Sequence, residues 1–250
     1  MSGFGSRFAM FQRISAAYRA SAKESLPRVS FKGIDSDQIV AQITAICEAN
    51  SDQTASTMKL PFRLYVKQSN IKNAGFGVFL GPCSGTLTVK QGTVVCLYPG
   101  VVYSSIDPIF FPSISNHFVL QRMDGSLIDG KHSGLSKYMF KSIRKRELAW
   151  NRVEYDNQWL DQRKEGESNN WNIGQLINNS FNNMDDANVV YNEFTLSQSF
   201  PMQWRQFIPN VPFAPEEENI FGIALVTTKD ISFSSLDDRV ELLASYQSLE

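Results

Sequence analysis

Two glycines one residue apart, Gly75 and Gly77, are the first residues in the chain whose spacing could serve a ligand. Glycine adopts a positive φ without strain, and its backbone can approach a bound molecule closely. Neither a third glycine nor a helical pattern follows, so the segment is not a dinucleotide-binding fingerprint. Taken alone, residues 73–79 are more typical of a tight turn than of a ligand loop.

Two adjacent amides, Asn178 and Asn179, follow an apolar stretch of the chain. Buried amides must find hydrogen-bond partners, so such a pair is typical of a polar network that joins several elements. The alternative is local capping of the backbone in a turn, which asparagine propensities favour when the segment is taken alone.

Two tyrosines belong to further segments with a recognisable order. Tyr98 ends the apolar run 92–98 and is followed by Pro99-Gly100, which predicts a strand that leads into a hairpin turn. Tyr246 lies four residues after Leu242 near the end of the chain. A lone tyrosine at such a place is most often an ordinary buried or interface aromatic.

Taken together and in order, these segments resemble those of the SET-domain family. The succession is Gly-Phe-Gly-Val-Phe (75–79), Gly-Thr-Val-Val with Tyr-Pro-Gly (92–100), an asparagine-rich element (171–180), Ala-x₅-Asp-Ile (224–231) and Glu-Leu-x₃-Tyr (241–246). The resemblance covers roughly residues 62–247, which is most of the chain.

The resemblance implies a mainly β fold, a β-clip of small curved sheets preceded by an N-terminal helical segment. The C-terminal segment would pass beneath a preceding loop and form a pseudoknot, a threading that is rare in proteins. This arrangement would bring Asn178 and Asn179 beside Tyr246.

The resemblance also implies an enzyme that transfers a methyl group from S-adenosylmethionine to a lysine side chain of a protein partner. The donor is expected to bind between Gly75-Phe76-Gly77 on one side and Asn178-Asn179 on the other, with Tyr98 and Tyr246 in the same pocket. The lysine would enter from the opposite face through an apolar channel, which favours loss of its proton. The hydroxyl of Tyr246 would orient the amine as the catalytic group.

Three positions depart from the family pattern. Asn179 replaces the usual histidine and Gln175 replaces a frequent arginine, and both favour a second hypothesis, a SET-like module that binds a cofactor or protein partner without turnover. Ala244 stands where a Phe or Tyr limits the number of methyl groups added, so the product is left open. The retained Tyr246 and Gly75 favour the enzyme.

A helix and several short strands must position these residues. Asp35–Gln38 resembles a capping box, and the helical stripe behind it predicts a helix that packs on the main domain, through Ile39, Val40, Ile43, Ile46 and Cys47. Short apolar runs broken by Gly, Pro and Asn then predict strands at Phe62–Val66, Gly77–Leu80, Thr93–Tyr98, His117–Leu120, Ser126–Ile128, Asn188–Phe194 and Phe221–Val226.

The expected organisation has three parts: a basic segment at 1–30, a helix and linker at 31–58, and a SET domain at 59–250. A charged insertion at about 131–170 is predicted to be partly helical and to end in a polar loop at Lys164–Asn170. Residues 1–23 are basic, free of acids and amphipathic, which suits either a mitochondrial transit segment or a disordered or surface-docked terminus.

Composition excludes other classes of protein. A net charge of −1 gives no basic face for nucleic acid, and no apolar run reaches the length of a membrane span. Three scattered cysteines predict a reduced intracellular compartment rather than a disulfide framework. His117 and His132 are the only histidines, and no cluster of metal-binding residues accompanies them, so we expect no metal site.

Overall fold

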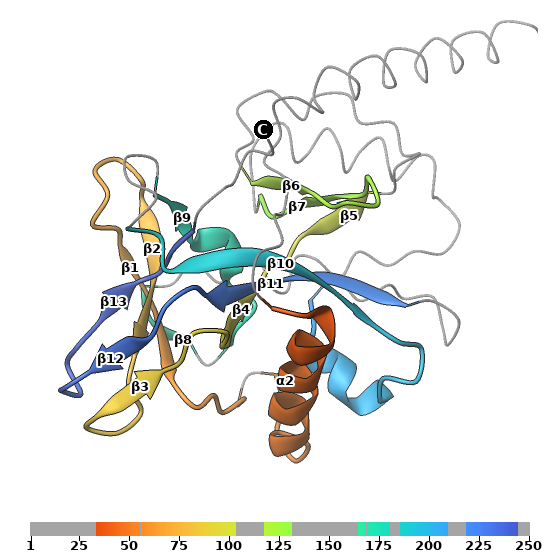
Figure 1. Ribbon diagram of the computed structural model, residues 1–250, viewed down its shortest axis with the longest axis horizontal. Coiled ribbons are helices and arrows are strands. Elements are labelled where there is room, and N and C mark those ends of the chain that lie inside the picture. Colours follow the sequence, from red (N-terminus) through yellow and green to blue (C-terminus); the bar gives the residue numbers. More distant parts are fainter. Residues whose placement is uncertain are drawn as a thin grey trace, which may run out of the picture.

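The computed structural model describes residues 34–55, 57–103, 118–131, 165–168, 170–180, 186–209 and 219–244. Within these ranges, short strands form four small sheets, and α2 (Ser36–Ala49) is the one α-helix (Figure 1). The mainly β fold predicted from the sequence is therefore confirmed. The basic segment at 1–30, both histidines, Tyr246 and most of the predicted insertion lie outside the described residues.

The largest sheet has five strands in the order β4-β11-β10-β14-β9, and a second sheet has four in the order β13-β2-β1-β8. A three-stranded sheet has the order β5-β7-β6, and β12 pairs with β3. The strands are β1 Arg63–Gln68, β2 Phe76–Gly81, β3 Leu87–Val89, β4 Val94–Leu97, β5 Val101–Tyr103, β6 Val119–Gln121, β7 Leu127–Asp129, β8 Gly166–Ser168, β9 Asn178–Asn179, β10 Val189–Leu196, β11 Ile220–Thr227, β12 Ile231–Phe233, β13 Val240–Glu241 and β14 Leu243–Ala244.

The strands predicted from apolar runs are all present, with ends shifted by one or two residues. The polar loop predicted at Lys164–Asn170 is wrong in part, because Gly166–Ser168 forms β8 at the edge of β1. This strand is formed by backbone pairing with Leu64, Tyr65 and Val66, and it needs no apolar side chains of its own.

The Pro99-Gly100 turn does not make the predicted hairpin. β4 pairs with β11, whereas β5, which follows the turn, pairs with β7 in another sheet. A side chain at Gly100 would collide with the backbone carbonyl of Asp129. The turn therefore carries the chain closely past β7 from one sheet to the next.

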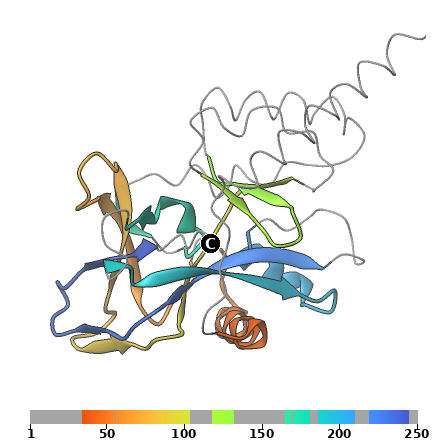
Figure 2. The same ribbon diagram turned by 45° about the horizontal axis from the view of Figure 1, so that its top comes forward.

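Helix α2 forms where the sequence predicts it. Asp35 caps its first turn and accepts a hydrogen bond from the amide of Asp37 at 3.3 Å, rather than from the amide of Gln38 as a capping box would. Its predicted apolar stripe faces β10 and β4, with these residues fully buried: Ile39, Ile43 and Cys47. Figures 1 and 2 both show the helix beside β10 and β11 of the five-stranded sheet.

One side chain of α2 also completes the backbone bonding of β4. The amide of Gln42 donates to the carbonyl of Gly92 at 2.8 Å and accepts from the amide of Val94 at 2.9 Å. Backbone groups at a strand start need such partners when they are buried. Gln42 thus holds the helix at one place on the sheet.

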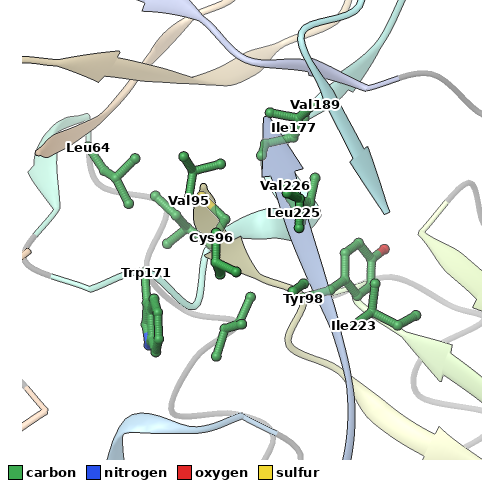
Figure 3. Close-up of a cluster of buried hydrophobic side chains, with 14 of the residues drawn as sticks. Leu64, Val95, Cys96, Tyr98, Trp171, Ile177, Val189, Ile223, Leu225 and Val226 are labelled. Atoms are coloured by element: carbon green, nitrogen blue, oxygen red, sulfur yellow. The ribbon is translucent and has the colours of Figure 1, made fainter. Parts of the chain in front are cut away.

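The core is a single apolar cluster that spans β1, β4, β10 and β11 (Figure 3). Trp171 is fully buried within it, and its indole N–H donates to the carbonyl of Phe207 at 2.8 Å. The carbonyl of Trp171 accepts from the amide of Leu97 at 2.8 Å. The segment that leads into β9 is therefore fixed against β4 by packing and by hydrogen bonds.

All three cysteines are free thiols, as the sequence predicts for a chain without a disulfide framework. Burial raises the pKa of Cys47 to about 12 and also raises the pKa of Cys96. Neither thiol is therefore a thiolate nucleophile at neutral pH.

The C-terminal segment is threaded between elements that precede it in the sequence by more than forty residues. β14 lies parallel to both β9 and β10 and between them, and β13 pairs antiparallel with β2. At the two ends of the connection between β9 and β10, the amide of Ser180 donates to Ala244 at 3.0 Å and that of Asn188 donates to Leu243 at 2.9 Å. This is the threading that the predicted pseudoknot requires.

The side chain of Asn188 holds this segment in place. Its carbonyl oxygen accepts from the amide of Leu243 at 2.9 Å, and its Nδ2 donates to the carbonyl of Glu241 at 2.8 Å. Asn188 is buried, so water cannot replace either bond.

The substitution Asn188→Ala should lower the free energy of unfolding by about 3 kcal/mol, because it leaves two buried backbone groups without partners. Asn192→Ala, on β10, is the matched control. The Oδ1 of Asn192 is buried without a described partner and its one bond, to Val190, is long at 3.4 Å, so we expect a loss below about 1 kcal/mol. Urea unfolding measures both variants, and equal losses would contradict the role of Asn188.

Candidate functional site

The predicted donor-binding segments meet at the start of β2. Asn178 of β9 donates its Nδ2 to the carbonyl of Phe76 at 3.0 Å, across 102 positions of sequence. β13 lies against β2 and β14 lies against β9, so the C-terminal segment adjoins both. Asn178 thus joins separate elements, as the network interpretation predicts, rather than capping its own turn.

Glu241 lies where these elements meet, and the sequence analysis did not identify it as a site residue. Its carboxylate accepts from the hydroxyl of Ser69 at 2.6 Å and from the amide of Asn70 at 2.8 Å. The residue is only 7% exposed. A glutamate inside the apolar run Val240–Ala244 was the available signal, because a charge in a buried strand needs partners built around it.

Gly75 and Gly77 are glycines for two different reasons. Gly75 has φ +75°, and no described residue lies within 4 Å of the place that a Cβ would take. A Cβ at Gly77 would instead collide with the carboxylate of Glu241 and lie 3.2 Å from Nδ2 of Asn178. Only Gly75 therefore leaves backbone open for the approach of a ligand.

The loop between β1 and β2 is closed at its base and held from the side. The amide of Ser69 donates to the carbonyl of Gly75 at 2.8 Å, and the hydroxyl of Ser69 accepts from the amide of Ile71 at 3.0 Å while it donates to Glu241. The conformation of the loop that presents Gly75 thus depends on the C-terminal segment.

The side chain of Tyr98 contacts a different set of residues from the set around Gly77. Its side chain is buried, and its hydroxyl donates to the carbonyl of Phe118 at 2.8 Å. A side chain at Gly130 would collide with Tyr98 and with Gln175. In Figure 3, the tyrosine oxygen points away from the core cluster towards the ribbons of β5–β7.

Two further positions in the asparagine-rich segment, Asn179 and Gln175, also have defined surroundings. Asn179 is half-buried and pairs with Ala244 in the sheet, two residues before Tyr246. Gln175, in the 3₁₀ helix Gly174–Leu176, is buried, and its Oε1 has no hydrogen-bond partner among the described residues. Tyr246 itself lies outside the described residues.

Neither a metal centre nor a membrane span is found in the part of the chain that the structure describes. No group of three His, Cys, Asp or Glu side chains there could hold a metal ion. No described helix is long and apolar enough to cross a membrane.

Comparison with known proteins decides the family. Two proteins named SET domain-containing protein 9, from Homo sapiens and Pongo abelii, are each 33% identical to this chain over 209 residues. The aligned regions cover 80% of this chain, 66% of the human protein (just under two thirds) and 72% of the protein from Pongo abelii. The chain belongs to the SET-domain family. No protein-family model matches it.

One of the ordered SET-domain motif residues, Asp230, has a structural role. It accepts hydrogen bonds from Nζ of Lys90 and from the amide of Gln91, each at 2.8 Å. These two bonds hold the pKa of Asp230 below its ordinary value. Asp230 therefore ties the connection between β11 and β12 to the connection between β3 and β4, and none of its described contacts is with the segments predicted to bind the donor.

The substitution Gly77→Ala should lower the free energy of unfolding of this SET domain by about 2 kcal/mol, because the added methyl displaces the carboxylate of Glu241 from its two donors. Gly85→Ala is the control, since Gly85 has no positive φ and no described residue within 4 Å of its Cβ position. We expect that variant to remain within about 0.5 kcal/mol of the parent.

A double-mutant cycle separates the collision from other effects. Gly77→Ala combined with Glu241→Ala should lose less stability than the sum of the two single losses, because the colliding groups are no longer both present. Urea unfolding of the four proteins measures this coupling. Additive losses would show that Glu241 is not the reason for glycine at position 77.

Proposed function

We propose that this SET domain is a protein-lysine N-methyltransferase that uses S-adenosylmethionine as its methyl donor. The observation that supports the proposal best is the bond from Asn178 to Phe76, together with the pairing of β14 with β9. These contacts gather the two donor-binding segments and the C-terminal segment, which otherwise lie far apart in the sequence.

The residues present suit a cationic donor. Gly75 offers open backbone at a positive φ, and the carboxylate of Glu241 lies next to Gly77. When bound, the donor supplies a methyl group that its sulfonium has already activated. The protein then has to hold a neutral amine in line with that group and to exclude water.

In the proposed site, the donor lies between the Gly75-Phe76-Gly77 segment and Asn178-Asn179 and approaches the open backbone at Gly75, and Tyr98 adjoins the pocket on the side of Gln175. The hydroxyl of Tyr246 orients the lysine amine. The amine loses its proton before transfer, which an apolar channel favours because it destabilises the ammonium form. The nitrogen–carbon bond then forms as the sulfur–carbon bond breaks, and the donor leaves as a neutral thioether.

Donor binding is the first test. S-adenosylmethionine at a hundred times its Kd should raise the Tm of the full chain by about 5 °C or more, because the ligand binds only the folded state. Its demethylated product, S-adenosylhomocysteine, should also raise the Tm, and ATP serves as an adenosine-containing control. If neither adenosyl ligand shifts the Tm, the proposed function is wrong.

Tyr246→Phe tests the catalytic assignment. Loss of the orienting hydroxyl should lower methyl transfer by about a hundredfold and leave donor affinity nearly unchanged. Transfer of a labelled methyl group into proteins of a cell lysate measures turnover. Tyr65→Phe is the matched control, because the Tyr65 hydroxyl accepts from Arg239, which lies next to Gly81 at the other end of β2 from Gly77, and it should keep full turnover. Full turnover in Tyr246→Phe would refute the role of that hydroxyl.

A SET-like binding module without turnover is the second candidate function. Gln175 supports it, because a neutral amide stands where the family often has an arginine, and its buried Oε1 has no hydrogen-bond partner among the described residues. A Tm shift with S-adenosylmethionine but no methylation of any lysate protein would favour the module.

A further inference from the structure

Glu241 differs from the other strongly buried glutamate in the way its charge is balanced. Glu193 is 8% exposed and forms an ion pair with Arg122 at 3.3 Å. Glu241 is as deeply buried, but its two hydrogen-bond donors, the hydroxyl of Ser69 and the amide of Asn70, are neutral. Across the described ranges, no lysine or arginine forms an ion pair with Glu241.

Two cations close to Glu241 in the strand register, Arg239 and Lys67, are engaged elsewhere. Arg239 donates to the hydroxyl of Tyr65 at 2.8 Å and to backbone carbonyls of its own loop. Lys67 pairs with Gly77 in register, but its Nζ lies over the ring of Phe79, 5.5 Å from the ring centre, and its side chain is exposed. The charge of Lys67 is therefore held over Phe79 and forms no ion pair with the carboxylate of Glu241.

An enclosed carboxylate without a counterion lowers stability, and a cation that binds beside it relieves that cost. Nδ2 of Asn178 and the carboxylate of Glu241 both lie next to Gly77. The carbonyl of Gly75 accepts from the amide of Ser69, whose hydroxyl donates to the same carboxylate. S-adenosylmethionine carries one positive charge more than its thioether product, because only the donor has a sulfonium.

We propose that Glu241 is the charge that makes this site prefer the cationic methyl donor over its neutral thioether product. The inference rests on the proposed function and adds a specificity-determining residue to it. The preference would favour donor binding and would also speed the release of product once the sulfonium charge has gone.

Calorimetric affinities of the full chain for S-adenosylmethionine and S-adenosylhomocysteine test the proposal. In Glu241→Gln, the Kd of the donor should rise about tenfold and that of the product less than about threefold, since one unit charge acts on one ligand only. Measuring well below the Tm keeps both proteins folded, so a loss of stability alone does not move the ratio.

Glu167→Gln is the matched control. It removes the same charge from the same four-stranded sheet, but Glu167 is exposed and paired with Arg63 at 3.6 Å. Its ratio of donor to product affinity should equal that of the parent. Ser69→Ala removes the hydrogen bonds that the hydroxyl makes to Glu241 and to the amide of Ile71, but it keeps the charge of Glu241, so it should also keep the ratio.

A second variant keeps the proposal testable if Glu241→Gln does not fold. The side chain of Asn70 is exposed, and its backbone amide nitrogen lies 2.8 Å from the carboxylate of Glu241. Asn70→Lys therefore adds a cation close to an intact Glu241. The donor preference should fall in this variant as well.

The outcomes separate this inference from the proposed function. If the parent chain binds the donor but the affinity ratio is unchanged in Glu241→Gln and in Asn70→Lys, Glu241 does not select the donor and the proposed function stands. An equal loss of both ligands in Glu241→Gln also overturns the inference, because the carboxylate would then only support the loop. If the parent chain binds neither ligand, the proposed function is wrong, and the inference that rests on it is wrong as well.

Discussion

The insertion of β14 between β9 and β10 is the constraint on which the rest of this SET domain depends. Its register is set where the preceding residues cross β2, because Gly77 and Gly81 leave two spaces on one face of that strand. The carboxylate of Glu241 fills the first space and Arg239 fills the second. A slip of one residue would turn both side chains to the opposite face of the sheet. The same two glycines therefore fix the register of β13 on β2, and β14 follows β13 directly.

Along residues 240–244, successive side chains face opposite sides, so that apolar side chains enter the core while Glu241 faces a polar loop. Leu242 and Ala244 are fully buried in the core, whereas Glu241 faces the loop of Ser69. The backbone of this segment is bonded on both sides. The amide of Leu242 donates to Val78 of β2, and the amide of Leu243 donates to the side chain of Asn188. A segment of five residues can thus carry the proposed site only because the surrounding sheets satisfy its backbone.

The sequence predicts those parts of the fold whose signal is local. β10 and β11 are eight residues long and apolar enough to be found from their composition alone. β9, β13 and β14 are two residues long, and their hydrogen bonds come from partners that local propensity cannot identify. The hairpin expected at Pro99-Gly100 failed for the same reason, because turn residues report the local backbone and not the partner strand.

Prediction of the candidate site follows the same division. The spacing of the two glycines located the Gly75–Gly77 segment, and the sequence predicted that both glycines admit a ligand. In the structure, Gly77 instead makes room for the carboxylate of Glu241, which lies 164 positions later in the chain. Nothing local distinguishes a glycine that admits a ligand from one that admits a side chain of the protein. The decisive difference is φ, positive at Gly75 and not at Gly77, and it is set by the closed loop rather than by the residue. In this family member, the glycine spacing therefore marks the contact of Glu241 with the loop as much as it marks the proposed donor site.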